Sequence, residues 1–119
     1  MEIIIAQARV SSVARGPESA QADTARRIAT FLPLPSLLAG ARVLHDEDEN
    51  MTALQLPTLA GPVLVVMPLA EEFEYSIIFE GETGRRIIGS VREDRRVKGN
   101  AARVVAYRVA EFLRTRRLV

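Results

Sequence analysis

The chain has 119 residues, which is enough for one domain with a hydrophobic core. Its 16 Lys and Arg nearly balance 15 Asp and Glu, and a charged share of 26% with 48% hydrophobic residues argues against disorder of the whole chain. No cysteine is present, which excludes disulfides, thiolate metal sites and cysteine nucleophiles. No apolar run approaches the roughly 20 residues of a membrane span, and nothing resembles a signal peptide, so we expect one cytoplasmic domain over residues 1–119.

The first part of the chain predicts a strand and two helices. Residues 2–10 alternate between apolar and polar side chains, which favours a strand, although the same residues could begin a helix. Pro17 is a good first-turn residue and predicts a helix over residues 17–32, which must stop before Pro33. Residues 34–40 predict a short helical turn that ends at a glycine.

Three strands are expected in the middle of the chain. Residues 41–45 and 51–56 read as short strands on either side of an acidic loop at 46–50. Residues 62–68 form an unbroken apolar run with a proline at each end, which is typical of a strand buried on both faces. Such a strand needs cover on two sides. We expect the C-terminal helix on one side and the helix at 17–32, or a second subunit, on the other.

A hairpin follows. Residues 73–80 alternate strictly, and residues 86–92 form a second strand after a five-residue loop at 81–85. In the register that we expect, residues of opposite charge lie opposite each other, and apolar residues lie opposite apolar residues. The expected pairs are Glu80–Arg86, Phe79–Ile87, Ile78–Ile88, Ile77–Gly89, Ser76–Ser90, Tyr75–Val91 and Glu74–Arg92.

Ile78 and Ile88 then form an apolar spot on the outer face of this hairpin, between two Glu–Arg pairs. One interpretation is a small patch under a loop or a second layer, since isolated exposed apolar residues are normal. The other is the centre of a homodimer interface. Both stay open at this stage.

The last predicted element is a long helix. Asn100 is a good N-cap for it. Its apolar stripe consists of Ala101, Ala102, Val105, Val109, Phe112 and Leu113. We expect the stripe to pack on the sheet face that carries Phe73, Tyr75, Ile77 and Phe79. The predicted fold class is therefore α+β, a mostly antiparallel sheet of four to five strands packed by a long C-terminal helix and an N-terminal helix.

The near-neutral net charge hides a strong division along the chain. Residues 85–119 hold eleven Arg and Lys against three acids, a net charge of +8. Residues 18–84 hold three Arg against eleven acids, a net charge of −8. Such asymmetry predicts either that the basic third meets an acidic partner, or that the two halves neutralise each other within one molecule or between two copies.

The acidic loop partly resembles a calcium-binding loop. Asp46, Asp48 and Asn50 match the first three ligand positions of a calcium-binding loop. The pattern then fails, because Met51 stands where the turn glycine is needed and Pro57 stands where the bidentate glutamate is needed. We therefore expect no metal and no cofactor. The loop reads as a solvated charged turn, or as a mimic of a phosphate backbone.

Catalysis is also not expected. His45 is the only histidine, and its neighbour Asp46 suggests a general-base pair. No nucleophile is placed beside it, because Ser76 and Ser90 belong to strands and no nucleophile-elbow motif is present. A lone histidine next to acids is expected at the surface. An enzyme centred on His45 is kept only as a third hypothesis.

The first hypothesis is a small non-enzymatic binding protein, such as an adaptor, inhibitor or accessory factor. It would dock on a protein partner, or on its own copy, through the Arg/Tyr face of the C-terminal helix. That face consists of Arg103, Tyr107, Arg114 and Arg117, which match the composition of a protein–protein hot spot. The alternative is a nucleic-acid-binding protein that uses the basic region 85–117. Its further contacts would be Arg92, Arg95, Arg96 and Lys98.

Overall fold

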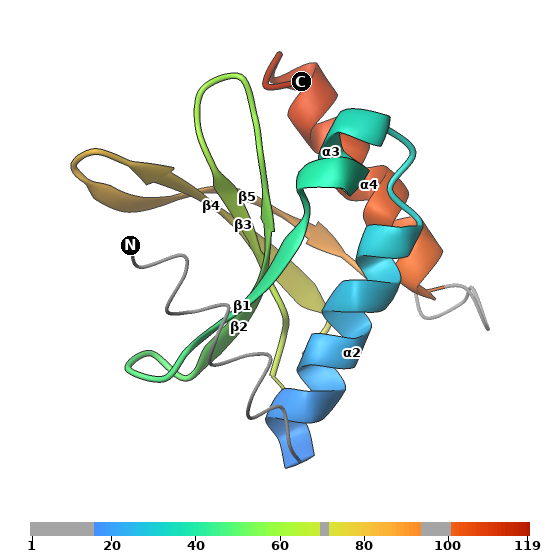
Figure 1. The fold of residues 1–119 in the computed structure, drawn as a ribbon, viewed down its shortest axis with the longest axis vertical. Helices are drawn as coiled ribbons and strands as arrows, with labels where there is room; N and C mark the ends of the chain where they lie inside the picture. Colours follow the sequence, from blue (N-terminus) through green and yellow to red (C-terminus); the bar gives the residue numbers. More distant parts are fainter. Residues whose placement is uncertain (1–15, 70–71, 94–100) are drawn as a thin grey trace.

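The structure is a computed structural model, and it describes residues 16–69, 72–93 and 101–119. It confirms the α+β class: a five-stranded antiparallel sheet carries its helices on one face (Figure 1). Several predictions fall outside the described residues. They are the strand over 2–10, the N-cap at Asn100, and the placement of Arg95, Arg96 and Lys98.

The helices follow the predicted starts and stops. Helix α2 spans Gly16–Thr30, α3 spans Pro35–Gly40 and α4 spans Ala101–Thr115. Prolines lie in the first turns of α2 and α3, where a missing N–H leaves no intrahelical bond unmade. In the described part of the chain, no helix combines the length and apolarity that crossing a membrane requires.

The five strands form a meander in which each strand pairs with the next. Their bounds are Arg42–Asp46 for β1, Met51–Leu56 for β2, Val63–Val66 for β3, Glu74–Gly81 for β4 and Gly84–Arg92 for β5. The spatial order is β1-β2-β3-β4-β5, so β1 and β5 are the edges of this sheet. Every connection between neighbouring strands is therefore short and local in sequence.

Helices α2 and α4 pack side by side on one face of the sheet, here called the helix face (Figure 1). Helix α2 lies over β1 and β2, whereas α4 lies along β5. The predicted stripe of α4 is confirmed at Val105, Val109 and Leu113, which are fully buried against the main core. Tyr75 and Ile77 are the β4 residues beneath them.

The expected position of α2 was wrong, because α2 shares the helix face with α4 instead of covering the other side. Strand β3 is nevertheless buried on both faces, as predicted. Val63 and Val65 belong to the main core, whereas Leu64 belongs to a second cluster on the opposite face. That second cluster contains Leu44, Ala53 and Leu64, with Met51, Val66 and Ile78 partly buried around it.

The predicted hairpin register was right for half of its length. The pairs from Glu74–Arg92 to Ile77–Gly89 are as expected. Beyond them a bulge in β5 shifts the ladder by one residue, so that Glu80 pairs with Arg85 and the loop has two residues instead of five. Gly84 closes this tight loop with φ +124°, a backbone conformation that favours glycine.

The bulge also separates the two isoleucines that were expected to form one spot. Ile78 lies opposite Ile87 on the face away from the helices, and Ile87 is 69% exposed. Ile88 instead packs against the main core on the helix face. The shared Ile78/Ile88 spot is therefore wrong, because one inserted residue reverses the alternation.

Candidate functional site

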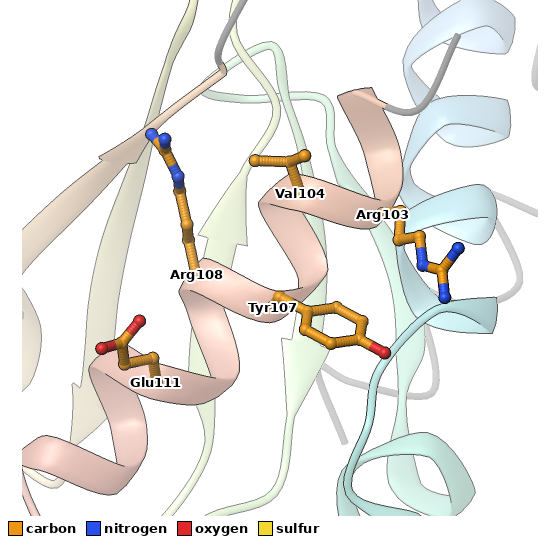
Figure 2. A pocket seen from close by; sticks show the side chains of 5 residues that line it. All are labelled: Arg103, Val104, Tyr107, Arg108 and Glu111. Atoms are coloured by element: carbon orange, nitrogen blue, oxygen red, sulfur yellow. The ribbon is translucent and has the colours of Figure 1, made fainter. Parts of the chain in front are cut away.

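Helix α4 exposes two flanks that differ in their surroundings (Figure 2). Arg103 and Tyr107 project from one side of the helix, whereas Arg108 and Glu111 project from the other. Both flanks are basic. The first carries the residues selected from the sequence, and the second faces the edge strand β5.

The first flank is called the Arg/Tyr surface and consists of Arg103, Tyr107, Arg114 and Arg117. Tyr107 is 50% exposed, and the Arg103 guanidinium lies 5.9 Å from the centroid of its ring, which is a cation–π distance. Arg114 follows Tyr107 by seven residues, which returns it to the same side of the helix. Arg117 lies in the turn beyond α4, with φ 58°. The structure thus brings three of the four together.

A shallow hollow of about 390 Å³ runs over this part of α4. It is lined by Arg103, Val104, Tyr107, Arg108 and Glu111 (Figure 2). Since these residues all come from one helix, the hollow is an open depression and does not enclose a small molecule in the way that a typical ligand pocket does.

Within the described part of the chain, Arg85 joins the basic third to carboxylates of the acidic half. Its guanidinium lies 3.1 Å from the Asp46 carboxylate, 3.8 Å from that of Glu49 and 3.2 Å from that of Glu80. These contacts join the β4–β5 hairpin to the β1–β2 turn on the face away from the helices. In a flat sheet, four strand spacings would separate β1 and β5 by about 19 Å, so the sheet must coil strongly for the contact to form.

The Arg85 cluster also sets the ionisation of Asp46. Burial alone would raise the pKa of this carboxyl. The Arg85 hydrogen bond and the backbone N–H groups of Glu49 and Asp48 outweigh that effect and hold the pKa of Asp46 below its ordinary value. The acidic loop is thus a hydrogen-bonded turn in which Arg85 contacts Asp46 and Glu49.

The arginines of the Arg/Tyr surface are not neutralised in the same way. Among the ion pairs formed within residues 16–69, 72–93 and 101–119, none involves Arg103, Arg114 or Arg117. Self-neutralisation therefore accounts for Arg85 but leaves this positive surface without a carboxylate partner in the described structure.

The second flank was not identified from the sequence. Arg108 donates a hydrogen bond to the Arg92 carbonyl at 2.9 Å, and Arg116 donates one to the Ile88 carbonyl at 3.4 Å. A groove of about 390 Å³ lies between β5 and α4, here called the β5–α4 groove. Its lining includes Ser90, Arg92, Arg108, Glu111, Phe112 and Arg116. The helical wheel alone could not reveal it, because the groove depends on which strand lies beside α4.

The residues proposed for nucleic-acid contact are only partly described. Arg92 is exposed at the end of β5, next to Arg108. The aromatic rings nearby offer little room for a base. The guanidinium of Arg116 lies 3.8 Å from the centroid of the Phe112 ring, and the edge of that ring abuts Gly89. Tyr107 is thus the more open of the two rings on α4.

The expected surface position of His45 was wrong. The side chain is buried, and its Nδ1 lies 3.1 Å from Thr52 Oγ1. Asp46 is the next residue in β1, so its carboxylate points to the opposite face and binds Arg85. The two side chains do not form the imagined pair. Within the described ranges, no group of three or more His, Asp or Glu is arranged to hold a metal ion.

Comparisons with protein-family models, with curated protein sequences and with solved structures returned no match to this chain.

Proposed function

We propose that this protein is a non-enzymatic binding module that docks on an acidic protein surface through the Arg/Tyr surface of α4. The observation that carries the proposal is the combination of a half-exposed tyrosine with arginines that have no carboxylate partner in the described structure. Tyr and Arg are the residues most enriched in binding hot spots. The partner would be an acidic protein, and the protein would act as an adaptor, inhibitor or accessory factor.

The geometry of α4 supports this proposal. The helix is held rigidly, because Val105, Val109 and Leu113 are fully buried on its inner side. Its exposed side chains are therefore displayed at fixed positions before any partner binds, which lowers the entropic cost of association. The open hollow beside Tyr107 could accept an apolar side chain from the partner, with the arginines around it contacting acids.

Site-specific photocrosslinking tests the proposal. A photoreactive phenylalanine derivative replaces Tyr107 in one sample and Thr83, at the tip of the β4–β5 hairpin, in a control sample. We expect a discrete protein adduct, identified by mass spectrometry, that forms only from position 107. Replacing Arg103 and Arg114 by Gln should remove it. Identical adduct patterns from positions 107 and 83 would contradict the proposal.

A nucleic-acid partner is the alternative outcome of the same experiment. In that case the adduct at position 107 would disappear after nuclease treatment. Short labelled DNA and RNA would also bind, with an affinity that falls steeply between about 50 and about 200 mM salt because counterions are released. The Arg103→Glu, Arg114→Glu and Arg117→Glu triple variant would then lose that binding.

A further inference from the structure

The β5–α4 groove has an ordered arrangement of arginines along an edge strand. Glu93 donates its N–H to Phe73 on the β4 side of the hairpin, and successive residues of a strand point their backbone groups in opposite directions. The carbonyl of Arg92 therefore points to the edge. The alternation breaks at the β5 bulge, where the carbonyl of Ile88 is within reach of Arg116. Arg108 and Arg116 bind these two carbonyls from α4.

These two contacts show that α4 runs antiparallel to β5 and in register with it. Four residues of a strand, from Ile88 to Arg92, cover about 13 Å, and eight residues of a helix, from Arg108 to Arg116, cover about 12 Å. The two carbonyls that bind the guanidiniums are thus separated by roughly 12 to 13 Å along β5. Both side chains remain exposed.

The groove carries more basic than acidic side chains. Ser90 lies halfway between the two carbonyls on β5, and its hydroxyl donates to the Glu74 carboxylate at 2.6 Å, whereas the Phe112 ring lies against Gly89 beside the Arg116 guanidinium. The lining carries Arg92, Arg108 and Arg116 but only one acid, Glu111. The groove therefore has a guanidinium near each end and a net positive lining.

We propose that the β5–α4 groove is a second docking site, which binds an extended acidic peptide segment of a partner protein. In an extended chain, side chains four residues apart lie about 13 Å apart on the same side, which matches the spacing of the two carbonyls that bind the guanidiniums. The recognised segment has a carboxylate at its first and fifth positions, one for each guanidinium. Each carboxylate accepts charge-assisted hydrogen bonds from one guanidinium, which carries five N–H donors.

Two observations favour a peptide over single-stranded nucleic acid. Binding of a single strand generally uses an open aromatic face on which a base can stack. In this groove the Phe112 ring is covered by the Arg116 guanidinium and packs on the main core, with its edge against Gly89. The carbonyls of Arg92 and Ile88 are also occupied, so the segment would lie over this part of the edge strand without pairing with it.

The test uses fluorescence anisotropy with labelled synthetic peptides. The probe Gly-Ser-Glu-Thr-Val-Thr-Glu-Ser-Gly carries the two glutamates four residues apart. One control peptide replaces both glutamates by glutamine, and the other places them two residues apart around the same valine. We expect the probe to bind at least about tenfold more tightly than either control.

The protein variants separate this site from the Arg/Tyr surface. The Arg108→Gln, Arg116→Gln variant should lose at least about tenfold in affinity for the probe, whereas the Arg103→Gln, Arg114→Gln variant has the same net charge and should change it by less than about threefold. Amide shifts in a two-dimensional NMR spectrum should concentrate in β5 and in the second half of α4. If the crosslink at position 107 fails while the probe binds here, only the proposed function is contradicted.

Four results would overturn the inference. They are no binding of the probe at about 1 mM, equal binding of the three peptides, equal loss in the two charge-matched variants, and binding of an oligothymidylate of about ten nucleotides in preference to the probe. A concentration-dependent dimer that the Arg108→Gln, Arg116→Gln variant abolishes would also overturn it, because the occupant would then be a second copy. The peptide controls remain informative even if a protein variant folds poorly.

Discussion

The two faces of the sheet are stabilised by different means. The helix face is sealed by α2 and α4 over a large apolar core, in which Leu54, Ile77 and Leu113 have no exposed surface. The opposite face has a small apolar cluster around Leu64 and a charged cluster around Arg85. The comparison teaches that one face of a sheet can supply most of its stability through an apolar core, while the other face carries the ion pairs.

The largest expected effect comes from two neighbouring residues of β4. Ile77 is fully buried on the helix face, whereas Ile78 is only partly buried on the opposite face. Ile77→Ala should lower the free energy of unfolding by about 3 to 4 kcal/mol, and Ile78→Ala by about 1 to 2 kcal/mol, because only the first leaves a closed cavity. Denaturant titrations measure both, and equal losses would contradict the distinction between the faces.

The contact between β5 and α4 predicts the next effect. A Cβ added at Gly89 would lie 2.4 Å from the Phe112 ring, so one of them must move. Gly89→Ala should cost about 1 to 3 kcal/mol through overpacking. In a double-mutant cycle, Phe112→Leu should recover part of this loss. A purely additive double variant would show that the clash is not the cause.

The charged cluster around Arg85 should contribute less to stability at low pH. Arg85→Met is expected to cost about 1 kcal/mol at neutral pH, and the exposed control Arg86→Met close to zero, since partly exposed ion pairs contribute little.

The pKa of Asp46 is lower in the folded protein than in the unfolded chain. Its stabilisation is therefore complete above the unfolded value of about 4 and is lost as the pH falls through the folded value. Below pH about 4, the free energy of unfolding of the Asp46→Asn variant should fall less steeply with pH than that of the wild-type protein. Equal slopes for the two proteins would contradict this.

The packing on the helix face should become less stable at high pH. Burial, together with the nearby charge of Glu93 and a hydrogen bond to it at 3.4 Å, raises the pKa of Tyr75 to about 12. A raised folded pKa means that the stabilisation is complete below the unfolded value of about 10 and is lost as the pH rises toward 12. Wild-type protein should lose about 1 kcal/mol between pH 9 and 11 that Tyr75→Phe does not lose. Thermal melts of the wild-type protein and of Tyr75→Phe, each at pH 9 and pH 11, measure this difference.

The smallest effect is expected at the exposed end of the hairpin. Ile87 is 69% exposed and lies opposite Ile78. Ile87→Thr keeps the β-branched shape that suits a strand, and it should change the free energy of unfolding by less than about 0.5 kcal/mol. A larger loss, measured by the same denaturant titration, would mean that Ile87 contributes to the cluster on the opposite face.

Patterns along single elements were enough to predict the helices, the five described strands and the inner stripe of α4. Alternation and helical periodicity report which side of an element is apolar, and this is a local property. They do not report how elements are arranged around one another. For that reason the position of α2 was wrong, and the partners of Arg85 and the β5–α4 groove were not foreseen.

The β5 bulge shows the same limit within one hairpin. Charge pairing correctly placed Glu74 opposite Arg92, but it could not detect one extra residue at Ile88. The inserted residue moved Ile88 to the helix face and left Ile87 opposite Ile78. For the candidate site, three of the four residues on the Arg/Tyr surface share one flank as the wheel predicted, whereas Arg108 and Arg116 acquire their importance only from contact with β5.

The meander has a consequence for the protein as it leaves the ribosome. Each strand pairs with the strand before it in the sequence, so hairpins can form in the order of synthesis. The entropic cost of closing each loop is small because the loops are short. Helix α4 follows all five strands, and until it emerges the apolar row that includes Tyr75, Ile77 and Val91 lacks its cover. If the hairpins form as they are synthesised, this apolar row stays exposed until α4 is made, and exposed apolar surface at that point favours aggregation.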